Sequence, residues 1–411
     1  MRVLICGIDG YIGWPLALRL QSEGFDVYGI DNFSRRKYVR SIGAHSALPI
    51  SSMEQRLDVT RKHAGKRIKF YHGDLRKYAD ASRVVKESKP DAIVHLGEQP
   101  SAPFSMISHK HASDTQQNNV LGTLNLLFAI RDNARDAHLV KLGTMGEYGT
   151  PNVEIPEGFF DIEYQGRRDR LPFPRQAGSF YHLSKVHDSA NIALACKIWG
   201  LISTDIMQGV VYGSRTRELA DYRLNTRFDF DQIFGTVINR FCAQAVIGYP
   251  LTPYGRGGQK RGFIALVDSI QCLTLAIQNP PRSGEYRVFN QLDAVYGVNE
   301  LAEHVKMVAD TMNMDVEIRP IENPRVEAEE HFYEVEHERL KKLGFHPTRS
   351  LDEELEIMLR DLLRFKSRIV AKKQVIAPTI TWRDQRMAPE IIPQKTKTIE
   401  VPEQMTRSSI A

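Results

Sequence analysis

A threonine, a tyrosine and a lysine are spaced in this chain of 411 residues as a set that can take a proton from an alcohol. Tyr181 precedes Lys185 by one turn of a helix, so both side chains lie on one face. A nearby ammonium favours the phenolate, which lets Tyr181 act as a general base far below the usual tyrosine pKa of about 10. Thr144 follows the apolar run 139–143, and its hydroxyl completes the set. This chemistry needs a hydride acceptor, so the interpretation of these three residues is stronger if the chain also binds a dinucleotide.

The N-terminal segment carries the pattern of a dinucleotide-binding site. The apolar run 2–6 predicts a buried strand, and Gly7, Gly10 and Gly13 follow it, ahead of a helical pattern. Such glycines let the backbone approach a pyrophosphate at a helix N-terminus. A second predicted strand, 27–30, ends at Asp31, which is placed to bind an adenosine ribose. The predicted cofactor-binding residues are Gly7, Gly10, Tyr11, Ile12, Gly13, Asp31, Asn32, Ser34, Arg35, Asp74, Leu75, Leu96, Tyr181 and Lys185.

The residues around Asp31 also bear on the choice of cofactor. A carboxylate at this position repels a 2′-phosphate, which favours NAD. Arg35, Arg36, Lys37 and Arg40 follow closely and are the residues that would serve NADP instead. On the charge of Asp31 we predict NAD.

The order of predicted elements indicates an α/β fold. Strand and helix signals alternate from residue 1 to about 205, which predicts a Rossmann-type doubly wound parallel sheet. We expect an NAD-binding domain over 1–205, a smaller C-terminal α/β substrate lobe over 206–365 and an extended arm over 366–411. The basic connection between Asp31 and Asp74 has a middle part, 51–60, that can be helical, but a solvated insertion is the preferred interpretation. The segment 154–178 carries several arginines and is expected to roof the active site, namely Arg167, Arg168, Arg170 and Arg175.

Composition excludes several classes of protein. The hydrophobic fraction of 42% and the charged fraction of 26% are ordinary for a soluble protein, and the net charge of +5 is spread out. The basic residues form no stripe interleaved with aromatic residues, so no nucleic acid partner is expected. No apolar stretch reaches the length of a membrane span, and the first strand begins at residue 2. We therefore expect a cytoplasmic protein, or one of the plastid stroma if the chain is processed. His109, His111 and Asp114 lack a complete ligand set, so no metal is expected.

The combination of motifs resembles the extended short-chain dehydrogenase/reductase family, whose members act on nucleotide sugars. The resemblance covers about residues 1–345. It is carried by the glycine motif with Asp31, by 74–75, 95–96, 119–123, the Tyr181–Lys185 pair and 261–268. It implies NAD as the cofactor and a homodimer formed through two helices of the large domain.

Within that family, the segments 98–103, 144–149, 208–213 and 323–331 resemble the branch that makes the sulfolipid headgroup donor from UDP-glucose and sulfite. The family's 4,6-dehydratases follow the threonine with Asp-Glu. Met145 and Gly146 stand at these positions here, which puts plain dehydratase chemistry in doubt. The alternatives are a UDP-hexose 4-epimerase or dehydratase, and an NAD-binding module without catalysis. The resemblance leaves open whether sulfite arrives free or from a donating partner protein.

The implied reaction needs acid and base groups beyond the set of Thr144, Tyr181 and Lys185. Glu147 and His182, both adjacent to that set in sequence, are the candidates. Alternatively, Glu147 caps a helix or has another structural role. The alternative for His182 is a histidine on the helix surface without a catalytic role. The predicted substrate-binding residues, with Arg261 and Arg325 favoured for the diphosphate, are Gln99, Ser101, Asn119, Thr144, Gln208, Arg256, Arg261 and Arg325.

Overall fold

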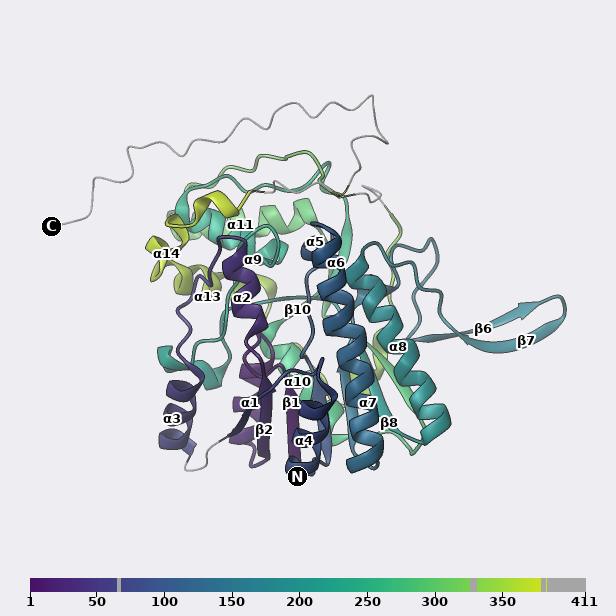
Figure 1. The fold of residues 1–411 in the computed structure, drawn as a ribbon. Helices are drawn as coiled ribbons and strands as arrows, with labels where there is room; N and C mark the ends of the chain where they lie inside the picture. The colour runs from purple at the N-terminus through teal and green to yellow at the C-terminus, as the bar shows by residue number, and fades with distance from the viewer. Residues whose placement is uncertain (65–67, 326–330, 378–381, 383–411) are drawn as a thin grey trace.

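The computed structural model describes residues 1–64, 68–325, 331–377 and 382. Its centre is a seven-stranded parallel sheet in the order β11-β8-β5-β4-β1-β2-β3 (Figure 1). The strands are β1 (Arg2–Cys6), β2 (Asp26–Asp31), β3 (Lys69–His72), β4 (Ala92–His95), β5 (His138–Leu142), β8 (Ile202–Gln208) and β11 (Tyr286–Gln291). The predicted Rossmann-type doubly wound fold is confirmed.

Helices cover both faces of this sheet, so its central strands are buried along their whole length and neither face meets water. One face packs against α4 (Tyr78–Ser88), α7 (Gly122–Asn133) and α8 (Phe180–Trp199), which bury a cluster that includes Leu126 and Ile192. The other face packs against α1 (Gly13–Ser22) and α10 (Leu266–Gln278). The remaining helical segments of this part are α5 (Ala102–Ser105), α6 (His109–Gln116), η1 (Gln117–Leu121), η2 (Met145–Glu147) and α12 (Glu338–Lys342).

A smaller unit sits above the carboxyl ends of the strands (Figure 1). It contains the sheet β12-β10-β9 and a group of helices around a separate apolar cluster. Its elements are β9 (Val210–Tyr212), α9 (Val237–Ile247), β10 (Lys260–Ala265), β12 (Ala294–Gly297), α11 (Val298–Thr311) and α13 (Leu351–Leu363). The short helices η3 (Arg217–Leu219) and η4 (Tyr222–Leu224) instead bury Leu219 and Leu224 in the apolar cluster of the large unit. The chain returns to the large sheet at β11 after building much of this unit, and the predicted boundary at residue 205 falls inside β8. The two units are thus interleaved in sequence.

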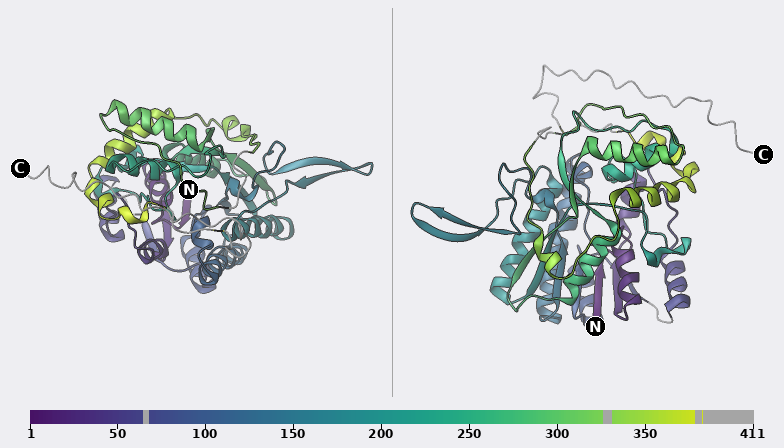
Figure 2. Two further views of the ribbon diagram at one scale, coloured as in Figure 1. Left: turned by 90° about the horizontal axis from the view of Figure 1, so that it is seen from above. Right: turned by 180° about the vertical axis from the view of Figure 1, so that it is seen from behind.

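The segment 154–178 forms a hairpin that projects from the body of the molecule (Figures 1 and 2). Its strands are β6 (Phe159–Tyr164) and β7 (Arg167–Pro172), and Arg167, Arg168 and Arg170 are exposed on it. The prediction that this segment roofs the active site is wrong for the hairpin, because paired strands with exposed charged side chains point away from the cavity.

Two further predictions from the sequence are corrected. The connection after Asp31 folds into α2 (Ser34–Ser41) and α3 (Met53–Ala64), and α3 buries Met53 and Leu57 against the large unit, so it is not a solvated insertion. The start of the C-terminal arm is helical, in α14 (Lys366–Val370) and η5 (Lys373–Val375). It buries Ile369 and Ile376 in the apolar cluster of the small unit, which explains why this part is not extended. The rest of the arm, apart from Trp382, lies outside the described residues.

Candidate active site

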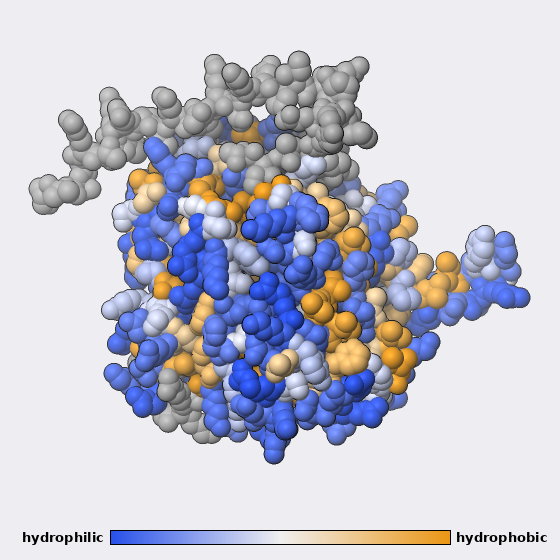
Figure 3. Space-filling model, in the orientation of Figure 1, coloured by the Kyte–Doolittle hydropathy of each residue, from blue (hydrophilic) through white to orange (hydrophobic). Residues whose placement is uncertain are grey.

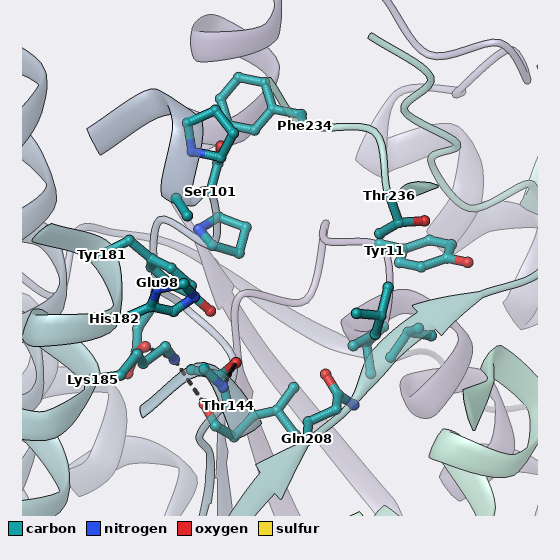
Figure 4. Close-up of a pocket in the computed structure, with 18 of the residues that line it drawn as sticks. Tyr11, Glu98, Ser101, Thr144, Tyr181, His182, Lys185, Gln208, Phe234 and Thr236 are labelled. Carbon is teal, nitrogen blue, oxygen red and sulfur yellow. Dashed lines mark hydrogen bonds and ion pairs between the residues drawn. The ribbon is translucent and has the colours of Figure 1, made fainter. Parts of the chain in front are cut away.

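A cavity of about 660 Å³ lies at the carboxyl ends of the parallel strands, between the two units (Figure 4). All fourteen residues predicted to bind the cofactor line it, from Gly7 to Lys185. Thr144, His182, Ser101, Gln208, Arg261 and Arg325 line it as well. The sheet therefore brings together in space the dinucleotide motif and the residues of the proposed proton transfer, which lie far apart in sequence.

The glycine loop after β1 fits a bound dinucleotide. Gly7 has a φ of +84°, and a Cβ on it would meet the Leu96 carbonyl oxygen at 2.6 Å. A Cβ on Gly13 would fall 2.3 Å from the Gly7 carbonyl oxygen, so this loop exists only with glycine at both positions. The result is a backbone cradle that opens on the cavity, ahead of α1, whose first N–H groups face it.

The charges near Asp31 favour NAD. The Asp31 carboxylate accepts the backbone N–H groups of Asp9 and Phe33 at 2.9 and 2.7 Å, which fixes it at the end of β2. Arg36 donates to both oxygens of Asp9 at 2.6 Å, and Arg35 pairs with Asp229 at 2.8 Å. Arg35 and Arg36, two of the four basic residues that would serve a 2′-phosphate, are thus engaged with carboxylates of the protein.

Tyr181 lies on the first turn of α8, where Ser179 caps the helix, and it hydrogen-bonds Thr144 at the end of β5. The Lys185 Nζ lies 6.0 Å from the centre of the Tyr181 ring. Burial raises the pKa of Tyr181, and the buried ammonium of Lys141 opposes this effect. In the protein without its ligands burial dominates, and the prediction that the Lys185 ammonium favours a Tyr181 phenolate stays a prediction for the complex with NAD and substrate.

Lys185 has a partner that sequence reasoning missed. Its ammonium forms an ion pair with Glu98, whose side chain is 2% exposed, and donates to the Leu142 carbonyl at 2.7 Å. The buried His95 lies with Nε2 3.2 Å from Glu98. Burial lowers the pKa of Lys185 to about 8. The sequence signal for Glu98 was its position directly after β4, because ligands bind at the carboxyl ends of parallel strands in such folds.

His182 lines the cavity beside Tyr181 (Figure 4). Its Nδ1 lies 3.1 Å from the Ser179 hydroxyl. Burial, with the positive charges of Arg325 and Arg261 nearby, lowers the pKa of His182 to about 3. The imidazole is therefore neutral near pH 7, and it is a weak base as long as the cavity is empty. It is not a surface histidine.

Glu147 is buried behind the cavity and does not line it. Its carboxylate pairs with Lys141, at 3.2 Å, and with Arg175, and it accepts the Ser189 hydroxyl at 3.0 Å. Lys141 also pairs with Asp205 at 3.4 Å. The geometry contradicts an acid/base role for Glu147 and supports the structural alternative, because its carboxylate joins Lys141 of β5, Ser189 of α8 and Arg175 of the loop before α8.

Three predicted substrate-binding residues do not line the cavity. Gln99 and Asn119 are buried and bond one another's backbone and side-chain groups, and Asn119 also donates to Ser184 on α8 at 2.8 Å. Both therefore brace the loop after β4. Arg256 lies in the loop before β10, outside the lining. Trp382, which sequence reasoning missed, lines the cavity with its ring 5.3 Å from the Arg325 guanidinium.

The described residues hold neither a metal-binding cluster nor a helix that could span a membrane. No cluster of three or more histidine, cysteine or acidic side chains suited to a metal ion occurs among them. Within the same part of the chain, no helix combines the length and apolar character needed to cross a bilayer.

Comparisons with known proteins agree with this architecture. The profile of the NAD dependent epimerase/dehydratase family matches residues 3–290. UDP-sulfoquinovose synthase of Sulfolobus acidocaldarius is 49% identical over 93% of this chain and 98% of its own length. The chloroplastic UDP-sulfoquinovose synthase of Spinacia oleracea is 47% identical over 95% of this chain and 81% of its own.

Solved structures show the same fold at low identity. A UDP-glucose 4-epimerase of Thermotoga maritima with UDP-glucose has a TM-score of 0.68 at 19% identity, over 89% of this chain and 99% of that one. A UDP-glucuronic acid 4-epimerase of Bacillus cereus, solved with UDP-glucuronic acid and NAD, has a TM-score of 0.66 at 18% identity, with the same coverage. The cofactor is NAD, and the chain belongs to the NAD dependent epimerase/dehydratase family, in the branch that contains the UDP-sulfoquinovose synthases.

Proposed function

We propose that the protein is a UDP-sulfoquinovose synthase, which converts UDP-glucose and sulfite to UDP-sulfoquinovose and water. The observation that carries the proposal is the close packing of the His182 ring against Gly146. Both residues line a cavity that also holds Thr144, Tyr181 and Lys185. The 4,6-dehydratases have an acidic pair after the threonine, whereas this chain has Met145 and Gly146 with a histidine beside them. The high identity to two synthases over nearly the whole chain supports the same assignment.

The first step is oxidation at C4 of the glucose ring. Tyr181 takes the proton of the C4 hydroxyl, and Thr144 orients the same oxygen. NAD, when bound, supplies two-electron oxidation at C4 and its later reversal, along with a positive charge that favours the Tyr181 phenolate. Lys185 adds an ammonium beside the phenol. The proton that Tyr181 takes goes back to the C4 oxygen at the end of the cycle.

The second stage changes C5 and C6. A ketone at C4 acidifies the C5 proton, and His182, neutral in its buried position, is the base that removes it. The proton taken from C5 passes to the C6 hydroxyl, which leaves as water and gives a C5–C6 double bond. Sulfite sulfur then adds at C6, and the proton that bisulfite carries goes to C5 through His182. Because His182 stands next to Tyr181 on α8, one helix turn presents both proton-transfer groups to adjacent carbons of one sugar.

Arg261 and Arg325 are the proposed ligands of the UDP diphosphate. Both line the cavity near His182, and guanidinium groups suit phosphate oxygens through paired donors. Neutralisation of their charge by a diphosphate would raise the pKa of His182 toward its usual range. Substrate binding would thereby make His182 a stronger base at the moment it is needed.

The absorbance of the bound nicotinamide tests this cycle. Addition of UDP-glucose without sulfite should reduce part of the bound NAD, and later addition of sulfite should reoxidise it. A 4-epimerase or dehydratase would give no response to sulfite. An NAD-binding module without catalysis would give no reduction at all.

The protein is further proposed to form a homodimer through α7 and α8. Apolar side chains gather on the surface over these helices (Figure 3), and Leu124, Leu194 and Ile198 are 38%, 54% and 55% exposed. Leu194 and Ile198 lie one turn apart on one face, as expected of a helical interface. The substitution Ile198→Glu should therefore yield monomers in size-exclusion chromatography.

A sulfite-donating partner and the compartment, cytoplasm or plastid stroma, stay predictions. Turnover with free sulfite and no second protein would remove the need for the partner.

A further inference from the structure

The segment 224–236, here called the strap, joins η4 to α9 and borders the cavity opposite Lys185. Phe234 and Thr236 mark it in Figure 4, with Tyr11 of the glycine loop beside Thr236. The strap has no helix or strand, yet most of its residues are buried, and Phe228 and Phe230 are fully so. Its Arg227, Phe234 and Thr236 line the same cavity as the glycine loop.

The strap is tied directly to the cofactor-binding elements. Thr226 donates to the Tyr11 carbonyl at 2.9 Å, and the Trp14 indole N–H of α1 donates to the Leu224 carbonyl at 2.8 Å. Phe228 receives a backbone hydrogen bond from Ala47, at 2.8 Å. These anchors hold the strap against the residues that surround a bound dinucleotide, so a cofactor in the cavity lies between fixed walls.

The far end of the strap is fixed as well. Gln232 donates its backbone N–H to the Val375 carbonyl at 2.9 Å, and Ser101 donates its hydroxyl to the Ile233 carbonyl. The Asp231 carboxylate accepts the backbone N–H groups of Ile233 and Phe234 at 2.9 and 2.8 Å, which shapes the turn before α9. Both ends of the strap thus have partners outside it.

The strap brings a second guanidinium to the cofactor end of the cavity. Arg227 and Arg35 share the carboxylate of Asp229, at 3.1 and 2.8 Å, and both line the cavity. The side chain of Arg227 is 3% exposed. Two donors of this pair, Nε of Arg227 and Nη1 of Arg35, are buried without an acceptor among the described residues. Buried donors of this kind cost free energy unless an acceptor arrives.

We propose that the strap retains NAD in the cavity and that Arg227 is a cofactor-binding residue, whose guanidinium in the cavity wall binds a diphosphate oxygen of NAD. The diphosphate is the part of NAD that offers anionic acceptors, and the glycine loop to which the strap is tied is where a diphosphate binds in this fold. Release of the cofactor requires the strap to leave the glycine loop. The inference rests on NAD binding and not on the choice of sugar.

Retention of NAD through extensive dialysis tests the proposal without any turnover. The wild-type protein should keep stoichiometric NAD, whereas Arg227→Met should release it about ten times faster or more, because a charge-assisted contact is lost. Arg223→Met removes an exposed arginine paired with Asp221 just before the strap, and it should release NAD at the wild-type rate. Thr226→Val, which removes one anchor and no charge, should also release NAD faster.

Equal release rates in wild type, Arg227→Met and Thr226→Val would overturn the proposal. If Arg227→Met does not fold, Arg227→Lys takes its place, because it keeps a charge but loses the planar guanidinium with its paired donors and should still release NAD faster. The thermal melting temperature of each variant with NAD in excess separates loss of the cofactor from loss of the fold. Failure of the sulfite reaction would leave these results unchanged, so the two proposals fail separately.

Discussion

His182 occupies the space that a side chain at residue 146 would fill. A Cβ on Gly146 would fall 2.3 Å from Nε2 of His182 and 2.4 Å from its Cδ2. The ring of His182 is half-buried in the cavity wall and held by Ser179, so it cannot yield at small cost. An acidic residue at 146, as in the 4,6-dehydratases, and a histidine in this rotamer exclude one another.

Gly146→Ala should therefore separate the two stages of the reaction. The added methyl displaces His182, so formation of the sulfonated product should fall by about 10²-fold or more, the usual value of a general base. Reduction of bound NAD by UDP-glucose should persist, because Tyr181 and Thr144 keep their places. Stopped-flow absorbance and product analysis measure the two stages. Gly297→Ala is the control, since its Cβ meets only the Gly257 carbonyl oxygen at 3.8 Å.

Tyr181→Phe should leave the cofactor bound and stop the first stage. The substitution removes the hydroxyl that takes the C4 proton, and we expect turnover to fall by about 10²- to 10⁴-fold. The NAD content of the purified variant and its kcat give the two readouts. Turnover close to wild type would show that another group is the base at C4.

The rate of NAD reduction should fall as the pH rises through the pKa of Lys185. That pKa is about 8, and the ammonium that supports the Tyr181 phenolate is present below it and lost above it. Glu98→Gln removes a carboxylate that favours the ammonium. The alkaline limb of the curve of NAD reduction rate against pH should therefore move to lower pH, by about one unit.

Several other charged groups face this pair, namely Lys141, Glu147, Asp188 and Asp205, and the variant leaves them unchanged. The pH profile of the double variant Glu98→Gln, Lys185→Met should match that of Lys185→Met alone. A limb that stays in place in Glu98→Gln would contradict the role given to Glu98.

Glu147→Gln should act on stability and not on the chemistry. It leaves the ammonium of Lys141 and the guanidinium of Arg175 short of one carboxylate in a fully buried cluster, so the free energy of unfolding should fall by about 3 kcal/mol. Urea unfolding measures this change. Glu163→Gln, on the exposed hairpin, should change it by less than about 0.5 kcal/mol. A wild-type unfolding midpoint with lost turnover would instead return Glu147 to the list of catalytic candidates.

The sequence predicted those features that depend on neighbours along the chain. The glycine loop with Asp31 and the Tyr181–Lys185 helix face are local patterns, and each is found in the predicted place. Predictions from sequence proximity alone were less secure. Glu147 is close to Thr144 in sequence but points behind the sheet, where Lys141 and Arg175 hold it.

Features that depend on distant contacts could not be predicted. Glu98 meets Lys185 because the Lys185 ammonium of α8 is bonded to the Leu142 carbonyl at the end of β5, and β5 lies beside β4, which Glu98 follows. The helix α3 was taken for a solvated insertion because its sequence is basic, yet its Arg56 is fully buried against Asp9 and the Trp14 ring. The sequence of the strap has no helical or strand periodicity, because its conformation is fixed by contacts with other elements.

The mass of the nucleotide sugar formed from UDP-glucose tests the central claim most directly. The purified protein is incubated with UDP-glucose, with and without sulfite, and the products are identified by mass spectrometry. The account predicts UDP-sulfoquinovose only when sulfite is present. An epimerised or dehydrated sugar that forms equally without sulfite would contradict it.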